Sequence, residues 1–248
     1  MSLLYILLII IGIIIFFILI FGLPRNKSSR RPNIEGIDSP EVAKAFEKMT
    51  NFLPFKILRK KVLGRINKLN PSGRLLDIGC GSGNLIVQIA EKFPHLELVG
   101  IDISAEILKR AKMRANENQK EIELKEGSVE KLPFSDEYAD FIVSTLSLHH
   151  WSNPQNAFQE IYRVLKKDGV GLIFDFRRDS RKFFYGFLTF ITKVAVPRPL
   201  REVNEPLGSI QSSYTPTEVR KLFSNISIED YSIKPTLAWM YIQIKKSS

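Results

Sequence analysis

The chain has 248 residues, 44% of them hydrophobic, which is enough to bury one sizeable core. Its single cysteine, Cys80, excludes an intramolecular disulfide framework and a metal site built from cysteines. The net charge is +10, but no zinc-finger spacing or aromatic RNA-binding signature accompanies the basic residues, so we expect no metal and no nucleic-acid partner.

The amino terminus carries an uncharged apolar run from Leu3 to Leu23. At about 1.5 Å per residue, its 21 residues match the roughly 30 Å hydrocarbon core of a bilayer, so we predict a transmembrane helix over residues 1–23. A cleaved signal peptide would have a basic start, a shorter apolar region and a small-residue cleavage site, and the sequence has none of these.

The residues that follow this run are polar and basic. No charged side chain precedes the run, so the positive-inside tendency predicts a single-pass membrane protein whose carboxyl-terminal domain lies in the cytoplasm. Residues 24–39, rich in proline and serine, are predicted to be a basic, extended polar tether. Basic residues outnumber acidic ones by 13 to 4 from Pro24 to Arg74 and by 7 to 1 from Arg177 to Arg201, which favours an anionic membrane surface nearby.

Two helices are expected next. Ser39 is a capping residue followed by Pro40, which indicates the start of the first helix. The second, amphipathic helix is predicted from Phe55 to Leu69. Its basic residues either face solvent or contact lipid, and the sequence leaves both open for Lys56, Arg59, Lys60 and Lys61.

From Arg74 onward, short apolar runs alternate with helical patterns. Helices are expected at residues 84–93, 104–116 and 154–165, and strands at residues 74–79, 96–103, 122–127, 139–146 and 169–176. This alternation implies an α/β fold with a doubly wound, mostly parallel sheet covered on both faces. After a helix capped by Thr215, residues 226–233 and 237–245 are predicted to form an antiparallel hairpin, which brings the sheet to seven strands.

An aromatic-rich segment lies between the fifth strand and these closing elements, within an insertion at residues 177–213. Its sequence, RKFFYGFLTFITKVAVPRP, fits a helix with a narrow polar stripe of Lys182, Gly186, Thr189 and Lys193. Burying each large apolar side chain is worth roughly 1.5–3 kcal/mol, so the rest of the helix either covers the ligand pocket as a lid or enters the lipid interface over residues 181–201. Both possibilities stay open, and both leave room for a lipophilic acceptor.

The stretch LLDIGCGSG places an acid and three alternating glycines at the end of the first strand. A parallel sheet binds ligands at the carboxyl ends of its strands, where glycines let the backbone approach a ligand closely. The spacing of Gly79, Gly81 and Gly83 departs from the dinucleotide fingerprint, because Asn84 stands where the last glycine would fall. The negative charge of Asp77 disfavours a pyrophosphate and favours a ligand that carries an ammonium and a sulfonium.

Together with the blocks VGIDIS, GSVEKLPFSDEYAD, SLHHW and EIYRVLKKDGVGLIFDF, this turn resembles the class I S-adenosylmethionine-dependent methyltransferases, in particular the branch that contains quinone and lipid methyltransferases. The resemblance runs from about Asn70 to Phe176 and more weakly to the carboxyl end. It implies a Rossmann-like domain over residues 40–248 that binds S-adenosylmethionine. It also implies that the methionine part of this cofactor is held by Asp77, Gly79, Cys80, Gly81 and Gly83.

The same resemblance assigns the rest of the cofactor site. Asp102 would accept hydrogen bonds from the ribose hydroxyls, with Ile103 beside it. Many relatives carry an aspartate where this chain has Ser128, which offers the adenine amino group a shorter, neutral acceptor. Val129 would offer its backbone amide to the adenine ring. Cys80 is expected to be a small filler rather than a nucleophile, because no histidine is placed in the sequence to activate it.

His149 and His150 follow the fourth strand, where the active site of this family opens. Either can serve as a base for a phenol, an alcohol or an acidic carbon, or one of them shapes the pocket wall with Trp151 without titrating. We therefore expect methylation of a lipophilic small molecule or lipid at the membrane. The alternatives are a membrane-tethered module that binds S-adenosylmethionine without turnover and a nicotinamide-dependent oxidoreductase.

Overall fold

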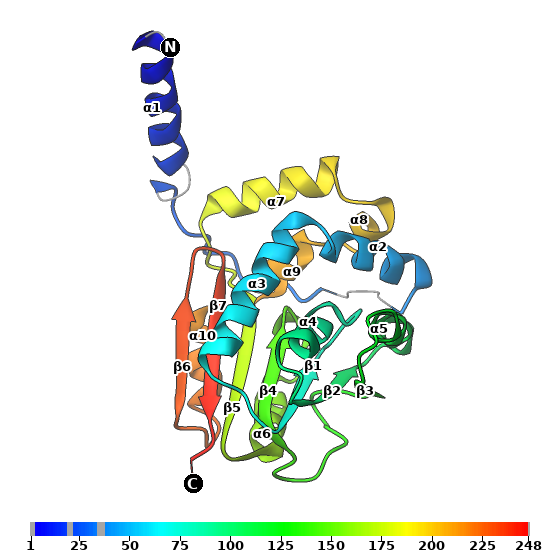
Figure 1. The fold of residues 1–248 in the computed structure, drawn as a ribbon. Coiled ribbons are helices and arrows are strands. Elements are labelled where there is room, and N and C mark those ends of the chain that lie inside the picture. Colours follow the sequence, from blue (N-terminus) through cyan, green and yellow to red (C-terminus); the bar gives the residue numbers. More distant parts are fainter. Residues whose placement is uncertain (1–2, 19–21, 34–37, 248) are drawn as a thin grey trace.

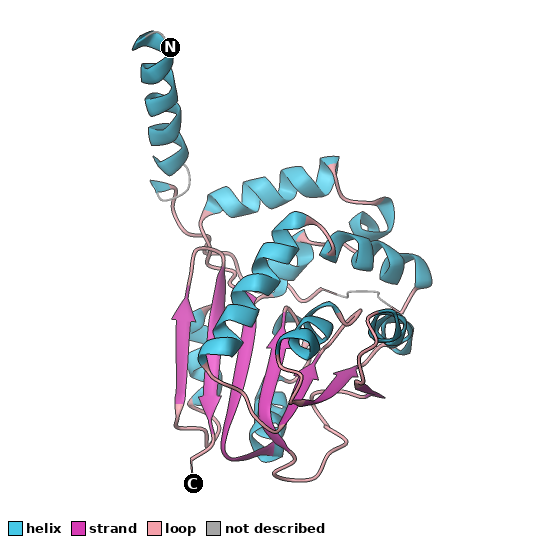
Figure 2. Cartoon of the chain, in the orientation of Figure 1, coloured by secondary structure: helices cyan, strands magenta, loops and turns pink. Residues whose placement is uncertain are grey.

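A seven-stranded sheet forms the centre of the fold, with helices packed on both of its faces (Figures 1 and 2). The computed structural model describes residues 3–18, 22–33 and 38–247. The strands are β1 (Arg74–Ile78), β2 (Glu97–Asp102), β3 (Glu123–Glu126), β4 (Ala139–Thr145), β5 (Leu165–Phe176), β6 (Tyr231–Pro235) and β7 (Trp239–Lys245). The helices are α1 (Leu3–Phe17), α2 (Pro40–Thr50), α3 (Leu53–Lys68), α4 (Asn84–Lys92), α5 (Ala105–Glu117), η2 (Leu148–His150), α6 (Pro154–Val164), α7 (Lys182–Val194), α8 (Arg198–Glu202), α9 (Leu207–Ser212) and α10 (Pro216–Phe223).

The strand order is β3-β2-β1-β4-β5-β7-β6. The first five strands pair in parallel, and β7 runs antiparallel to both β5 and β6, so the predicted sheet with its closing hairpin is confirmed. The chain leaves β1 toward β2 and β3 and then returns to β4 on the other side of β1. The strand order therefore reverses between β1 and β4, and ligands of such sheets bind at the carboxyl ends of the strands at that point.

Each face of the sheet has its own hydrophobic core. On one face, α6 and α10 bury Phe158, Ile161 and Phe223 against β-strand residues such as Ile142 and Met240. The other face is covered by α3 and α4 through residues that include Val62, Ile66, Ile86 and Ile89. Because both faces are covered, the central strands are apolar almost throughout, which is why their sequence shows continuous apolar runs rather than alternation.

Some element bounds differ from those predicted. β5 begins at Leu165 rather than at residue 169, because Leu165 already pairs with Ala139 before the register shifts at Phe141. β6 begins at Tyr231 rather than at residue 226, because Ile226 and Ile228 bond within a turn. α3 starts two residues before Phe55. Thr215 caps α10 as predicted, in a full capping box with Glu218, whereas the hydroxyl of Ser39 bonds Glu41 instead of the helix backbone.

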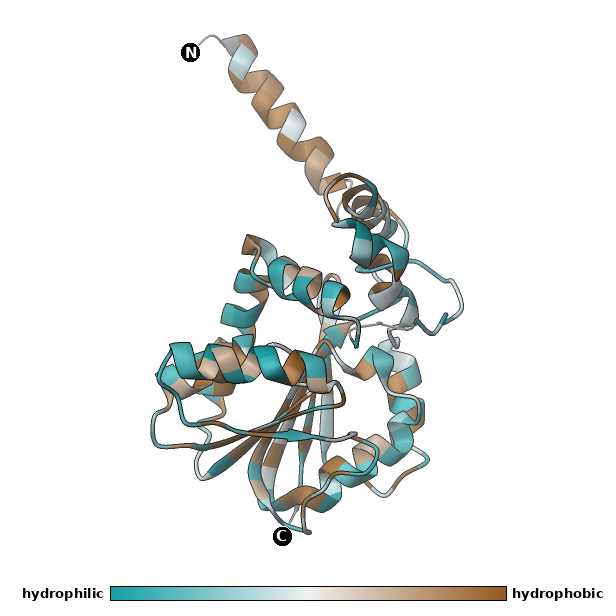
Figure 3. Ribbon diagram, turned by 90° about the vertical axis from the view of Figure 1, so that its right-hand side faces the viewer, coloured by the Kyte–Doolittle hydropathy of each residue, from teal (hydrophilic) through white to brown (hydrophobic). Residues whose placement is uncertain are grey.

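The amino-terminal apolar run forms α1, whose side chains from Leu4 onward are exposed; it is brown along most of its length in Figure 3. No helix within residues 3–18, 22–33 and 38–247 combines the length and apolarity that a membrane crossing requires. The predicted span over residues 1–23 includes residues 1–2 and 19–21, which lie outside the described part of the chain, and α1 itself ends at Phe17.

The predicted tether is docked on the domain, not free. We call residues 25–33 the strap; residues 34–37 of the predicted tether lie outside the described residues. The backbone amides of Asn26 and Arg31 donate to the carbonyls of Ser180 and Gln211 at 2.8 and 3.1 Å. The guanidinium of the buried Arg178 donates to the carbonyl of Ser28 at 2.9 Å. These contacts join positions about 150 to 180 residues apart, which local composition does not reveal.

Candidate active site

A cavity of about 730 Å³ opens at the carboxyl ends of β1, β2 and β4. Its volume lies within the range typical of small-molecule sites. Of the eleven residues predicted for the site, nine line the cavity, and Asp77 and Gly83 do not: the lining set is Gly79, Cys80, Gly81, Asp102, Ile103, Ser128, Val129, His149 and His150. The sheet topology thus gathers residues from four separate sequence blocks.

The glycine turn between β1 and α4 has the left-handed backbone that its composition predicts. Gly79 has φ +69°, and a Cβ there would lie 2.6 Å from the hydroxyl of Ser147. Gly83 has φ +77°, and a Cβ there would meet Ala111 of α5 at 3.2 Å. Gly79 is therefore needed for the approach of the turn to β4, and Gly83 for the packing of α4 on α5 rather than for direct lining of the cavity.

Asp77 is fully buried beneath this turn. Neither of its carboxylate oxygens has a hydrogen-bond partner among the described residues. Burial, and then the nearby charge of Asp102, raise the pKa of Asp77 from 3.8 to about 8. A buried carboxylate without a partner is costly, so its presence indicates that a positively charged ligand completes the site.

Asp102 ends β2 and lines the cavity next to the same turn. Its carboxylate accepts hydrogen bonds from the backbone amides of Gly81 at 2.8 Å and Ser104 at 3.1 Å. Burial raises the pKa of Asp102, and these amides partly oppose the shift. The next residue, Ile103, is 70% exposed although it is large and apolar. An exposed isoleucine beside a buried acid matches the predicted position of a nucleoside, whose ring is apolar and whose ribose carries hydroxyls.

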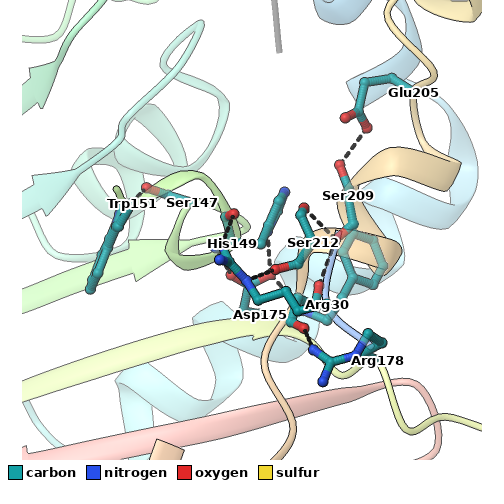
Figure 4. Close-up of polar contacts among 11 residues, drawn as sticks. Arg30, Ser147, His149, Trp151, Asp175, Arg178, Glu205, Ser209 and Ser212 are labelled. Carbon is teal, nitrogen blue, oxygen red and sulfur yellow. Dashed lines mark hydrogen bonds and ion pairs between the residues drawn. The ribbon is translucent and has the colours of Figure 1, made fainter. Parts of the chain in front are cut away.

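His149 is held by Asp175 from the end of β5 (Figure 4). The Nδ1 atom of His149 lies 2.7 Å from Asp175 Oδ1, and its backbone amide donates to Oδ2 at 2.9 Å. Both side chains are almost completely buried. A carboxylate at Nδ1 fixes the tautomer in which Nε2 is the proton acceptor, and Nε2 has no partner among the described residues. His149 thus has the geometry of a base.

His150 has a different environment. Burial, and then the adjacent His149, lower the pKa of His150 to about 2, so its imidazole is neutral and weakly basic. It also lines the cavity, while Asp175 orients the ring of His149. Of the two predicted bases, the geometry favours His149. Burial also raises the pKa of the Cys80 thiol, so this side chain stays protonated, in agreement with a filler role.

Several lining residues were not predicted. The strap contributes Arg30, Pro32 and Asn33, and α2 and α3 contribute Phe46, Thr50, Phe55, Leu58, Arg59 and Val62. No residue of α7 is among the described lining residues, to which α2, α3 and the strap contribute. Asp175 was not predicted as a site residue. The sequence contains one signal for it, because it is an acid between two phenylalanines at the end of an apolar strand.

Arg30 connects the strap to the candidate base. Its guanidinium donates to the carbonyls of Ser212 at 2.5 Å and His149 at 3.0 Å and stacks over the ring of Tyr214 at 4.2 Å (Figure 4). Asn33 donates to the buried carboxylate of Glu205 at 2.7 Å. Arg30 is one of the basic residues that follow the apolar run, and its guanidinium bonds within the domain.

The cavity fits S-adenosylmethionine on its own chemistry. Asp102 in the lining suits the ribose, and Ile103 with Val129 offers an apolar surface to the adenine. Asp77 lies beneath the glycine turn rather than in the lining, and its carboxyl group, which has no hydrogen-bond partner among the described residues, is suited to an ammonium close to that turn. When bound, this cofactor supplies an electrophilic methyl group on a sulfonium. Methyl transfer then depends on the orientation of the acceptor, and His149 has the geometry to accept a proton where the acceptor must lose one.

Comparison with known proteins agrees with this chemistry. The family model of a methyltransferase domain matches residues 76–173. The ubiquinone/menaquinone biosynthesis C-methyltransferase of Syntrophotalea carbinolica is 28% identical over 159 residues, which cover 63% of this chain and 67% of that protein. The demethylmenaquinone methyltransferase of Thermotoga maritima is 30% identical over 160 residues, which cover 63% and 68%. Across four such relatives the matched part spans 51–68% of their length.

A solved structure shares the fold. A crystal structure of a SAM-dependent methyltransferase from Aquifex aeolicus superimposes with a TM-score of 0.59 at 19% identity, covering 84% of this chain and 98% of that one. The chain belongs to the S-adenosylmethionine-dependent methyltransferases. The predicted family and cofactor are thereby confirmed, and the nicotinamide-dependent alternative is set aside.

Proposed function

We propose that the protein methylates a lipophilic acceptor of the quinone class, held in a membrane, with S-adenosylmethionine as the methyl donor. Two relatives are named for ubiquinone, menaquinone or demethylmenaquinone. The wall that α2 and α3 add to the cavity is largely apolar, with Phe46, Phe55, Leu58 and Val62. An apolar wall stabilises a prenylated ring better than a charged metabolite.

The His149 and Asp175 pair is the observation that carries this proposal. Methylation of a ring carbon that is activated by a hydroxyl replaces one hydrogen by one methyl group, so one proton must leave. The Nε2 atom of His149 is the acceptor within the cavity wall, and Asp175 stabilises the imidazolium that forms. An amine or thiol acceptor would make less use of a carboxylate-oriented imidazole.

Membrane attachment through residues 3–23 is the second part of the proposal. The side chains of α1 from Leu4 onward are uncharged, apolar and exposed, and a solvent-exposed apolar patch of this extent marks a site of membrane or protein contact. Lys27 and Arg31, which remain exposed on the strap, are cations next to this segment and favour a cytoplasmic domain. Co-flotation of the full chain with lipid vesicles, resistant to alkaline extraction, is expected; a chain that stays with the soluble fraction would contradict the attachment.

The activity is tested with the full chain in vesicles that contain a demethylated prenyl naphthohydroquinone and S-adenosylmethionine with an isotopically labelled methyl group. We expect the label in the lipid extract, on an acceptor heavier by one CH₂. His149→Asn is the matched variant, and it should bind the cofactor normally but transfer little label. Cofactor binding by the wild type without transfer to any quinone, phenol or lipid would support the alternative of a binding module without turnover.

A further inference from the structure

An apolar stripe on α7 faces away from the domain. Phe183, Phe187, Phe190 and Val194 follow one another by 4, 3 and 4 residues and therefore share one helix face. Phe190 is 61% and Val194 is 68% exposed, and Phe187 is exposed as well. The opposite face packs on the domain, where Thr192 is buried. The predicted polar stripe, which includes Lys182 and Lys193, lies beside this apolar stripe, and both stripes contain exposed residues.

A second exposed apolar group lies at the start of α3. Phe52, Leu53 and Ile57 are exposed, Leu53 by 69%. On its other side the same helix lines the cavity through Phe55 and Leu58. The first turns of α3 therefore carry both exposed apolar side chains and side chains of the cavity wall.

The helix α7 and the first turns of α3, which carry these groups, lie at the end of the molecule from which α1 projects (Figure 1). The start of α7 is also bonded to the end of the apolar amino-terminal run. The guanidinium of Arg181 donates to the carbonyl of Leu23 at 2.8 Å, and the amide of Lys182 donates to the carbonyl of Pro24 at 3.0 Å. If the amino-terminal run enters a bilayer, these two bonds hold α7 at its surface.

The charged residues of α3 and α7 are all basic. Neither α3 nor α7 contains an acidic residue. Exposed lysines flank the apolar side chains, with Lys56 and Lys60 on α3 and Lys182 and Lys193 on α7. Aromatic and aliphatic side chains bordered by lysines are typical of helices that lie in the headgroup region of an anionic bilayer.

We propose that the outer side of α7 and the first turns of α3 form a bilayer-docking face, defined by Phe52, Leu53, Ile57, Phe187, Phe190 and Val194. The partner is the leaflet that receives the amino-terminal run, and the acceptor enters the cavity along α3 without crossing water. This inference rests on the proposed membrane attachment and names the surface and the entry route that go with it.

The face is tested on the full chain bound to anionic vesicles. Leu53→Cys and Phe190→Cys each carry a fluorescent label, and Met113→Cys on α5, an equally exposed apolar position at 62%, is the matched control. The only native cysteine, Cys80, is buried, and the unsubstituted chain measures its background labelling. Quenching by nitroxide groups attached to the lipids is compared with quenching by a water-soluble quencher.

We expect lipid-borne quenchers to act at least twofold more strongly on positions 53 and 190 than on position 113. Equal quenching at all three positions of vesicle-bound protein overturns the docking face but leaves the attachment intact. A chain that does not float with vesicles overturns both. Protection of position 190 from both quenchers, together with a cross-linked dimer, would assign the face to a second copy of the chain and also overturn the proposal.

The entry route has its own readout. Leu53→Ser is expected to raise the KM for a vesicle-embedded acceptor about fivefold and to leave kcat/KM for a short-chain, water-soluble analogue unchanged. Met113→Ser should change neither value. An equal loss on both acceptors would show that Leu53 supports the pocket itself, and it would contradict entry along α3.

Discussion

Asp77→Asn gives the sharpest test of the cofactor site. The buried, unpartnered carboxyl group of Asp77 should lower the stability of the cofactor-free protein and, in the same position, favour binding of the cofactor. The pKa of Asp77 is raised from 3.8 to about 8 by burial and by Asp102. Between these two values the folded protein holds a proton that the unfolded chain has lost, so stability falls as the pH rises. Each pH unit costs about 1.4 kcal/mol, which gives about 3 kcal/mol between pH 5 and pH 7.

The asparagine variant has no carboxyl group to titrate and should not show this loss. Urea unfolding of the full chain without cofactor, at pH 5, 6 and 7, measures the free energy of unfolding. From pH 5 to pH 7, the stability of the variant relative to that of the wild type should increase by about 3 kcal/mol. Titration calorimetry should show that the same variant binds S-adenosylmethionine at least 100-fold more weakly, a loss of about 2.7 kcal/mol.

Asp140→Asn is the control, because the pKa of Asp140 is shifted in the opposite direction from that of Asp77. Hydrogen bonds from the Arg74 amide and from Lys166 outweigh burial and lower the pKa of Asp140. Its stabilising contribution is therefore complete above pH 4 and is lost only in more acidic solution. Over the range from pH 5 to pH 7, Asp140→Asn should follow the wild-type profile. A wild type and an Asp77→Asn variant whose difference in stability is the same at pH 5 and pH 7 would refute the account of Asp77.

The other predictions concern the base, the nucleoside contact and the strap. His149→Asn should lower kcat by about 10²- to 10⁴-fold with the cofactor Kd unchanged, as single-turnover kinetics with a quinone acceptor would measure; an unchanged kcat would remove His149 as the base. Ile103→Ser should weaken cofactor binding about tenfold in calorimetry, or about 1.4 kcal/mol, without lowering the unfolding temperature, because Ile103 is exposed. Arg30→Met should speed tryptic cleavage within residues 25–31 severalfold, since Arg30 bonds Ser212 and His149; unchanged cleavage would mean that the other contacts of the strap suffice.

The cofactor half of the site was predictable because it is built locally. Asp77, the glycine turn and Asp102 lie within one strand, helix and strand unit, and the required backbone conformations leave their mark in the sequence as glycines. The order of strands follows from the same alternation, since parallel strands need helical crossovers. Strand bounds were less predictable, as at Leu165, where a pairing partner and not a local preference decides where the strand begins.

The acceptor half was not predictable, because it depends on contacts between distant segments. Asp175 reaches His149 across 26 residues and two elements. Arg30 reaches the carbonyl of His149 across 119 residues and that of Ser212 across 182. Basic and proline-rich composition indicates only that residues 24–39 lack a core of their own. It does not indicate that a buried cation, Arg178, provides a docking site for them on the domain.

These long-range bonds change what the amino-terminal segment can do. A free tether would let the domain move away from the bilayer, and the pocket would then meet its acceptor by diffusion through water. Here Leu23 is bonded to Arg181, Arg30 to His149 and Asn33 to Glu205, so the chain runs from the apolar segment to the pocket wall without a free stretch among the described residues 22–33. With the proposed membrane attachment, the same few hydrogen bonds would hold both the domain and the pocket wall, and loosening the strap should disturb the candidate base as well as the orientation of the domain.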